Sequence, residues 1–437
     1  MIRLLYTLLL LLLTPLALLR LWWRGRGNPD YRRRWGERLG RVPELPARPR
    51  LWVHAVSVGE TIAAVPLVRA WRAAHPDWAI LITTTTPTGS AQVRRSFGNS
   101  VEHCYLPFDL PWLAAAFLRL SRPTLAIVME TEIWPNLYAG CQRLGLPLLL
   151  ANARLSDRSF RAYMRLRALV APTLGQVALI AARGAEDAER FIALGAPATR
   201  VEALGNLKFD LERSPQTLAR GQAWRTWLGA DRPVWIAAST HPGEEEQVLA
   251  AHRLLLQRQP SALLVLAPRH PERTTAVAEL AQAQGWRVLR RSALATAPAL
   301  PTPDQPAPGE RSVLVVDTLG ELMDFYAAGD IAYVGGSLVP NGGHNPLEPL
   351  VFGRPVLSGP QVFNFREVYA ELQALAAVTL VDSDAALGER LSAMLAHWPE
   401  LEQALPGPAV TDWLHRNQGS TARLIGRAEA LAGLRQA

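Results

Sequence analysis

Residues 51–60 read LWVHAVSVGE, a short apolar run followed by a serine, a glycine and Glu60. Such a run predicts a buried strand, and the polar residues behind it predict a helix start. Similar runs, each followed by a stretch with helical periodicity, recur at residues 78–83, 124–129, 147–152 and 177–182 and, after a polar interval, at 234–239, 262–267, 312–316, 331–336, 355–359 and 378–382. This alternation is typical of α/β folds, in which helices cover both faces of a parallel sheet.

The polar interval at residues 205–232 separates the alternation into two halves. We therefore predict an N-terminal Rossmann-like domain over residues 51–210, a linker over 211–230 and a second Rossmann-like domain over 231–437. Residues 296–309 contain five prolines and predict an extended surface loop in the second domain. Ligands of such sheets bind at the carboxyl ends of the strands, so we expect a binding cleft there, with one domain on each side.

The first 25 residues predict a membrane anchor. Leu4 to Leu19 carry no charge, and Arg20 follows directly. A cleaved signal peptide would end in small residues, whereas this run ends in arginine and tryptophan, so an uncleaved anchor is favoured. The run is short and contains Pro15, which leaves both a spanning helix and an interfacial helix open. In both cases the positive-inside rule places the remaining chain on the cytoplasmic side.

The positive charge of the chain is concentrated behind the anchor. Residues 1–50 hold eleven arginines and three acidic residues, and this surplus equals the net charge of +8 of the whole chain. The basic segment at residues 26–50 therefore predicts contact with an anionic membrane surface and not with nucleic acid. The two cysteines, Cys104 and Cys141, are too few for a disulfide framework and lack metal-ligand spacing.

Carboxylates follow two strands of the first half. Glu60 follows the strand at 51–56, and Glu130 and Glu132 follow the strand at 124–129. At a helix start, backbone N–H groups and the helix dipole would keep Glu60 ionised. From its position alone, Glu60 is either an ordinary helix-start residue or a catalytic carboxylate. Lys208, in GNLKFD, is either a solvated lysine or a group that neutralises a carboxylate or phosphate.

The second half offers loops suited to phosphate. Residues 335–350, GGSLVPNGGHNPLEPL, combine glycines with Asn345, Pro346 and Glu348, which predict a capped helix start able to hold an anion. Arg269, behind the strand at 262–267, would add donors. No Walker loop, GxGxxG fingerprint or HExxH motif occurs, which argues against an NTPase, a dehydrogenase and a catalytic metal. Four histidines lie near the expected strand ends, and for each the sequence is equally consistent with a hydrogen-bonding role in a loop and with catalysis: His54, His241, His270 and His344.

Taken in order, these motifs resemble the 3-deoxy-D-manno-octulosonic acid (Kdo) transferases of lipopolysaccharide synthesis. Besides the N-terminal anchor, the resemblance rests on HAVSVGE, METEIWPN, GNLKFD, ASTHPGEE, APRHPER, DTLGEL and GGHNPLEP, and it extends over nearly the whole chain. It implies a GT-B glycosyltransferase whose first domain takes a lipid acceptor and whose second domain takes CMP-Kdo. The implied reaction transfers Kdo, with inversion, to the 6′-hydroxyl of the tetra-acylated lipid A precursor in the bacterial inner membrane, and needs neither a cofactor nor a bound metal.

The resemblance also implies roles for single residues. Glu60 would be the general base, and Glu130 and Lys208 would stabilise the transition state. CMP would be held by Pro268, Arg269, Leu319, Gly320, Glu321, Asn345, Pro346, Leu347 and Glu348.

Two other functions remain as alternatives. Another GT-B enzyme, such as a nucleotide-sugar 2-epimerase or a different lipid-linked transferase, would share the two-domain architecture, but an epimerase acts on a soluble substrate and needs no anchor. A membrane-tethered protein that binds a nucleotide without catalysis would have no need for Glu60.

Overall fold

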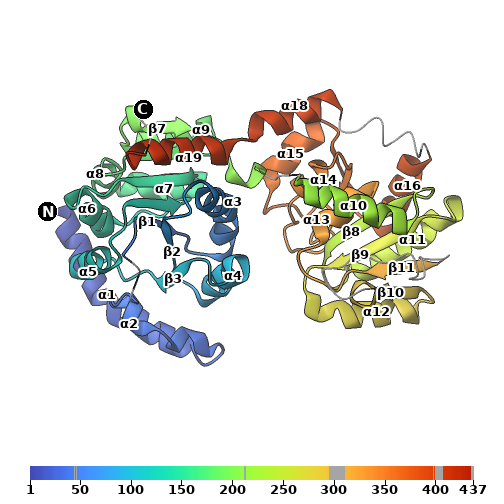
Figure 1. Ribbon diagram of the computed structural model, residues 1–437, viewed down its shortest axis with the longest axis horizontal. Helices are drawn as coiled ribbons and strands as arrows, with labels where there is room; N and C mark the ends of the chain where they lie inside the picture. Colours follow the sequence, from blue (N-terminus) through green and yellow to red (C-terminus); the bar gives the residue numbers. More distant parts are fainter. Residues whose placement is uncertain are drawn as a thin grey trace. The chain divides into compact units, whose positions relative to one another are not determined.

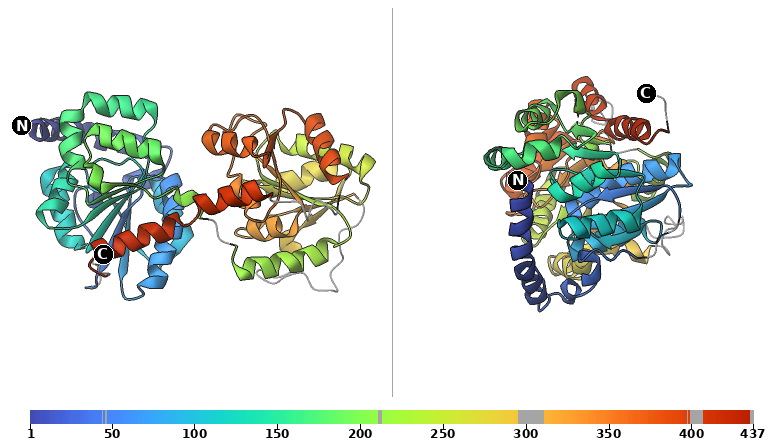
Figure 2. Two further views of the ribbon diagram at one scale, coloured as in Figure 1. Left: turned by 90° about the horizontal axis from the view of Figure 1, so that it is seen from above. Right: turned by 90° about the vertical axis from the view of Figure 1, so that its left-hand side faces the viewer.

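The computed structural model describes residues 1–43, 45, 47–210, 213–294, 311–396, 398 and 407–434. The predicted proline-rich loop at 296–309 lies outside them, as do the side chains of Lys208 and Pro271. The chain divides into two compact units, unit 1 with Met1–Asp210 and Asn417–Ala437, and unit 2 with Leu211–Arg416 (Figures 1 and 2).

Unit 1 contains a parallel seven-stranded sheet in the order β3-β2-β1-β4-β5-β6-β7. Its strands are β1 (Arg50–His54), β2 (Ala79–Thr84), β3 (Glu102–Tyr105), β4 (Leu125–Met129), β5 (Leu148–Ala153), β6 (Leu179–Ala182) and β7 (Val201–Ala203). Its helices are α1 (Ile2–Arg24), α2 (Trp35–Arg38), α3 (Val58–Ala74), α4 (Pro87–Phe97), α5 (Pro111–Ser121), α6 (Pro135–Arg143), α7 (Asp157–Arg165), α8 (Arg167–Leu174), α9 (Ala185–Leu194) and α19 (Ser420–Leu431).

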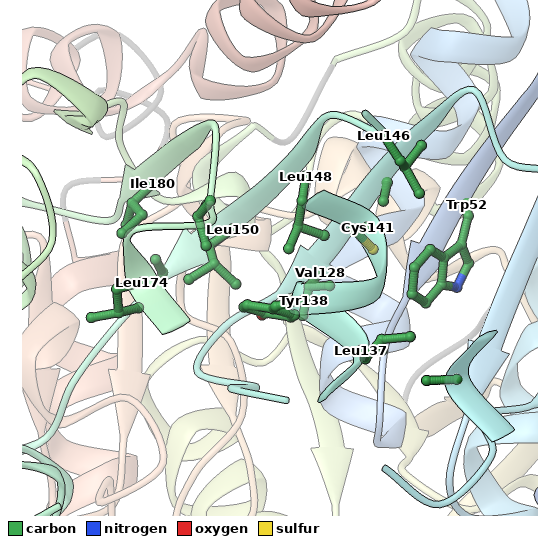
Figure 3. Close-up of a cluster of buried hydrophobic side chains, with 14 of the residues drawn as sticks. Trp52, Val128, Leu137, Tyr138, Cys141, Leu146, Leu148, Leu150, Leu174 and Ile180 are labelled. Atoms are coloured by element: carbon green, nitrogen blue, oxygen red, sulfur yellow. The ribbon is translucent and has the colours of Figure 1, made fainter. Parts of the chain in front are cut away.

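Alternate residues of each central strand enter two separate cores, because side chains on a strand point to opposite faces. Trp52, Val128 and Leu150 pack against α5, α6, α8 and α9, and Figure 3 shows Tyr138 and Cys141 of α6 in this cluster. The opposite face buries its side chains under α3, α4 and α19. Both faces are therefore covered, as the continuous apolar runs predicted.

Unit 2 contains a second parallel seven-stranded sheet, in the order β10-β11-β9-β8-β12-β13-β14. Its strands are β8 (Val234–Thr240), β9 (Leu263–Pro268), β10 (Arg287–Arg290), β11 (Ser312–Val315), β12 (Ile331–Val334), β13 (Val356–Ser358) and β14 (Val378–Leu380). Its helices are α10 (Pro215–Leu228), α11 (Glu245–Arg258), α12 (Thr274–Ala283), α13 (Leu322–Ala328), α14 (Leu347–Leu350), α15 (Arg366–Ala374) and α16 (Asp384–Leu395), and α18 (Pro408–Asn417) ends at the unit boundary.

The observed units differ from the predicted domains in two places. Residues 211–230, predicted as a linker, contain α10, because Trp224 and Leu228 are buried in the core of unit 2. The C-terminal segment, predicted within the second domain, belongs to unit 1, because Leu424 and Ala428 of α19 pack in its core. Figure 1 shows the red helix α19 beside the other elements of unit 1.

The N-terminal helix α1 is long and apolar enough, by length and composition, to cross a membrane. Its first turns are nevertheless attached to unit 1. The Tyr6 hydroxyl donates to Asp109 at 3.0 Å, and Asn136 donates to the Thr7 hydroxyl at 3.0 Å. The leucines on the remaining surface of the helix are exposed, for example Leu5 at 67% and Leu12 at 74%. One face of α1 therefore has no covering in the part of the chain that the structure describes.

Candidate active site

Glu60 lies in the first turn of α3, the helix that follows β1 in the sequence. Ser57 caps the helix, and its hydroxyl accepts from the Glu60 N–H at 3.4 Å. In return the Glu60 carboxylate accepts from the Val56 N–H at 2.7 Å and from the Ser57 hydroxyl at 3.0 Å. This reciprocal arrangement resembles a capping box, so the helix-start role that the sequence left open is real. It also holds the carboxylate in one position.

The ionisation of Glu60 differs from the sequence-based expectation. Burial, assisted by the nearby Glu132 and Glu130 carboxylates, raises the pKa of Glu60 to about 7, although the hydrogen bonds from Val56 and Ser57 oppose the rise. Desolvation outweighs the helix start because the side chain is only 9% exposed. The group is thus close to half ionised at neutral pH, which suits a residue that accepts a proton.

Glu130 and Glu132 stand at the end of β4, next to β1 in the sheet. Glu130 has φ 56°, a left-handed conformation that costs energy for a residue other than glycine, and it forms an ion pair with Arg154 at 3.1 Å. Burial and the charge of Glu130 raise the pKa of Glu132. The structure therefore gathers three carboxylates near the carboxyl ends of β1 and β4 in the sheet of unit 1. Sequence reasoning missed Arg154, although it follows β5 closely.

The GNLKFD segment forms a 3-10 turn, Leu207–Phe209, in unit 1. The Leu207 N–H donates to Asn152 at 3.1 Å, and Asp210 accepts from the N–H groups of Ser420 and Thr421 at the start of α19. The backbone around Lys208 is thus fixed from both sides, while its side chain lies outside the described part of the chain.

In unit 2, Pro268 ends β9 in a buried position, and Arg269 follows it with an exposed side chain. The Arg269 N–H donates to the Thr240 carbonyl at 3.0 Å, which joins the loop behind β9 to that behind β8. Burial raises the pKa of Glu348 to about 7, and both the Asn345 side chain and the charge of Arg269 oppose the rise. The charge of Arg269 therefore acts on Glu348.

The helix start expected at Asn345 and Pro346 is shorter than the sequence suggested. The Asn345 side chain accepts from the Leu347 N–H at 3.2 Å, but α14 spans only the four residues Leu347–Leu350. One helical turn carries little of the dipole that favours anions at longer helices. The dipole of α14 therefore offers little positive field to an anion near Asn345.

The loop with Leu319, Gly320 and Glu321 follows β11 and leads into α13. Leu319 is 71% exposed, and Gly320 has φ +88°. Glu321 accepts from Arg291 at 2.7 Å and from the Thr318 hydroxyl, so both of its oxygens are already engaged. Arg291 is fully buried and lies over the Trp224 ring at 4.9 Å. Glu321 therefore stabilises this loop, in addition to any contact with a ligand.

Two further side chains clarify which polar residues are structural. His54 is fully buried in β1 beside the Thr83 hydroxyl at 2.9 Å, and burial lowers its pKa to about 4, so it is a neutral residue of the strand. Glu244, in the loop STHPGEEE, is fully buried and accepts from five donors: the N–H groups of His241, Gly336, Ser337 and Leu338 and the Tyr333 hydroxyl. Its hydrogen bonds join the loop that follows β8 to the glycine-rich loop that follows β12. The only sequence feature that pointed to Glu244 was its position in the segment that follows a predicted strand.

No group of three or more His, Cys, Asp or Glu side chains in the described ranges has the arrangement of a metal site.

Comparison with known proteins identifies relatives over almost the full chain. Residues 33–211 match the family model described as 3-deoxy-D-manno-octulosonic-acid transferase (kdotransferase). The chain is 42% identical to the 3-deoxy-D-manno-octulosonic acid transferase of Haemophilus influenzae, covering 97% of both chains, and 37% identical to that of Bordetella pertussis, covering 98% of this chain and 99% of the relative. The crystal structure of the Neisseria meningitidis UDP-GlcNAc 2-epimerase has a TM-score of 0.54 at 13% identity, covering 87% of this chain and 99% of that one. At this identity the likeness shows the fold alone, and it confirms the predicted GT-B architecture of two Rossmann-like units.

Proposed function

This chain belongs to the 3-deoxy-D-manno-octulosonic acid transferase family, and we propose that it transfers Kdo from CMP-Kdo to the 6′-hydroxyl of the tetra-acylated lipid A precursor, with inversion. It is therefore a glycosyltransferase. The observation that carries the finer proposal is Glu60, a buried carboxylate that its capping contacts hold in place and whose pKa lies near neutrality. The test is incubation of the purified protein with CMP-Kdo and this lipid. A product heavier than the acceptor by one Kdo residue, found by mass spectrometry, supports it, and unchanged acceptor contradicts it.

In the proposed reaction the 6′-hydroxyl of the acceptor attacks the anomeric carbon of Kdo while the bond to the CMP phosphate breaks. Glu60 takes the hydroxyl proton, because inversion in one displacement needs a base on the acceptor side. Each Glu60 oxygen accepts one hydrogen bond from the protein and retains a lone pair for this proton.

The neighbouring groups of unit 1 support this step. Glu130 and Glu132 raise the proton affinity of Glu60, and we assign Glu130 and Lys208 to stabilising the transition state. The left-handed backbone of Glu130 supports a specialised role, since strain of this kind concentrates at functional sites.

Unit 2 would hold the donor. We assign CMP binding to Pro268 and Arg269, to Leu319, Gly320 and Glu321, and to the segment from Asn345 to Glu348. The departing CMP phosphate gains negative charge, and in this proposal the exposed guanidinium of Arg269 stabilises it without a bound metal. The 2-epimerases share this architecture, but the two Kdo transferases that match almost the full chain favour transfer.

The pKa of Glu60 leads to a pH prediction. Since only the ionised form accepts a proton, kcat/KM should rise about tenfold per pH unit below pH 7 and level off above it. Glu132→Gln removes a like charge, so it should lower the pKa of Glu60 and move this limb to lower pH. Glu189→Gln, at an exposed position on α9, is the matched control. If the rise of kcat/KM with pH were the same in Glu132→Gln as in wild type, the charge of Glu132 would not affect the pKa of Glu60.

The attachment of α1 bears on how the protein meets the membrane. A helix of this length is about 35 Å long, so a spanning arrangement would separate Tyr6 from Arg24 by the thickness of the bilayer. Tyr6 instead contacts Asp109, which accepts from the Asn136 and Leu137 N–H groups and thereby caps α6. We therefore propose that α1 lies at the cytoplasmic surface of the inner membrane with its exposed leucines in the lipid, and that the basic residues behind it meet anionic head groups.

Cysteine labelling distinguishes this arrangement from a spanning helix. Ile2→Cys should react with a membrane-impermeant maleimide from the same side of the membrane as Glu189→Cys. The native cysteines, Cys104 and Cys141, are fully buried and should stay unlabelled in the folded protein. Reaction of Ile2→Cys from the opposite side alone would show that α1 spans the bilayer.

A further inference from the structure

Three histidines meet at the carboxyl ends of strands in the sheet of unit 2. His241 follows β8, His270 follows β9 and His344 follows β12, and these strands are neighbours in the sheet. The Nε2 atoms of His241 and His344 are 2.8 Å apart, and the two rings are parallel within 3°, with centroids 5.1 Å apart. The ring of His270 stands edge-on to His241 at 5.6 Å.

The short distance between the two Nε2 atoms determines the tautomers. One Nε2 carries a proton and donates it to the lone pair of the other, because two neutral imidazoles cannot otherwise approach so closely. The donating ring then has a lone pair on Nδ1, and the accepting ring has an N–H there. Within the described residues neither Nδ1 atom has a hydrogen-bond partner.

The backbone holds the pair at this separation. Glu244 accepts from the N–H of His241 and from that of Gly336, so one buried carboxylate positions both loops. A Cβ at Gly336 would lie 3.0 Å from the His344 ring, and φ there is +70°, so only glycine leaves the pair undisturbed. The N–H of His344 donates to the Gly335 carbonyl at 3.2 Å.

The charged groups that face the pair directly are mostly cationic, although Arg273 is ion-paired with Glu245 at 2.9 Å and His270 lies 3.6 Å from Glu272. His241 faces Glu244, His270, Arg269 and Arg273, and His344 faces Arg269, His241 and His270. Burial lowers the pKa of His241, and burial followed by Arg269 lowers that of His344 to about 4, so the pair is neutral at pH 7. Glu244, the one carboxylate in this set, is already bonded to five donors. An added negative charge at this site would therefore meet mainly positive groups.

We propose that the His241–His344 pair contacts the phosphate of the donor nucleotide and takes up one proton from solvent when that phosphate binds. The inference rests on the proposed function, in which unit 2 binds CMP-Kdo. The proton is added at the free Nδ1, so the Nε2 hydrogen bond stays intact and both rings then carry an Nδ1–H. A nearby opposite charge shifts a pKa by about 1 to 3, and the phosphate supplies that charge.

The proposal assigns the pair a part in transfer. When the bond between Kdo and the phosphate breaks, its electron pair stays on the CMP oxygen and the phosphate becomes a dianion. The protonated pair places a cation beside it, in addition to Arg269, at a site where α14 contributes only one helical turn.

Calorimetry of CMP binding tests the inference. Titrations at pH 6.5 in buffers of different ionisation enthalpy count the protons taken up. Wild-type protein should take up a measurable fraction of a proton, at most one, more than His344→Asn or His241→Asn, and its CMP affinity should weaken between pH 6 and pH 8 by up to about tenfold per pH unit more than theirs. His415→Asn, at an exposed position on α18, should behave as wild type. Cytidine, which lacks the phosphate, should bind without proton uptake.

A second measurement needs no variant. In wild-type protein, imidazole ¹⁵N NMR at pH 6.5 should show the pair changing from neutral to cationic when CMP is added. Equal proton uptake in wild type and both variants, or a pair that stays neutral, overturns the proposal while leaving the proposed function intact. Uptake with CMP-Kdo but not with CMP overturns the assignment to the phosphate. Failure of wild-type protein to bind CMP overturns the proposed function and this inference together.

Discussion

Glu60→Gln should lower kcat by about 10²–10⁴-fold, the contribution of a general base, while leaving the affinity for CMP within about twofold of wild type. Glutamine retains the size of the side chain and a carbonyl oxygen that can accept from Val56 or Ser57, but it cannot take a proton. CMP affinity should hold because Glu60 belongs to unit 1, whereas the residues assigned to CMP belong to unit 2.

The control for this variant is its stability. The folded pKa of Glu60, about 7, lies above the unfolded value of 4.5, so the ionised carboxylate destabilises the protein as pH rises through this window. At pH 8 Glu60→Gln should therefore unfold at a temperature no lower than wild type. Transfer at a normal rate by the folded variant would rule out Glu60 as the base.

Glu244→Ala should lower the free energy of unfolding of unit 2 by at least about 3 kcal/mol. The substitution removes the acceptor of five donors, and each buried donor left without one costs about 1–3 kcal/mol. Any folded fraction should bind CMP more weakly, since the loop behind β8 and the glycine-rich loop are no longer joined. Denaturant unfolding and calorimetry measure the two effects.

Two neighbouring variants sharpen this experiment. Glu246→Ala changes an exposed residue two positions away and should leave both quantities nearly unchanged. Glu244→Gln retains one acceptor oxygen and should fall between wild type and Glu244→Ala. Wild-type stability and CMP affinity in Glu244→Ala would show that the two loops are held by other contacts.

The sequence predicted the buried centre of each sheet and missed part of its edge. Every predicted strand is present, because a strand covered on both faces is a continuous apolar run. The strands β3, β7 and β10 were not predicted. They are short edge strands with exposed or half-exposed residues, such as Glu102 and Arg287, so their composition resembles a loop.

For the candidate site, too, the sequence indicated where residues lie along the chain but not which distant residues they contact. Glu130 and Arg269 follow strands directly, and Glu60 lies in the helix start after β1, so the strand pattern placed all three near the carboxyl ends of strands. The contacts that decide their behaviour join distant segments, as between Arg154 and Glu130 or between Glu244 and Gly336. The raised pKa of Glu60 likewise depends on burial under the folded chain, which no local motif reports.

The return of α19 to unit 1 has a consequence for the order of events during synthesis. The ribosome releases residues 1–210 first, but the sheet face that Leu424 and Ala428 cover stays open until α19 emerges. Until then Asp210, beside the turn that carries Lys208, also lacks the N–H groups of Ser420 and Thr421. Unit 2 can bury its own core earlier, because its residues are contiguous. The first unit to be translated is therefore the last to be finished, and a chain cut short by premature termination cannot complete the unit that holds the proposed base.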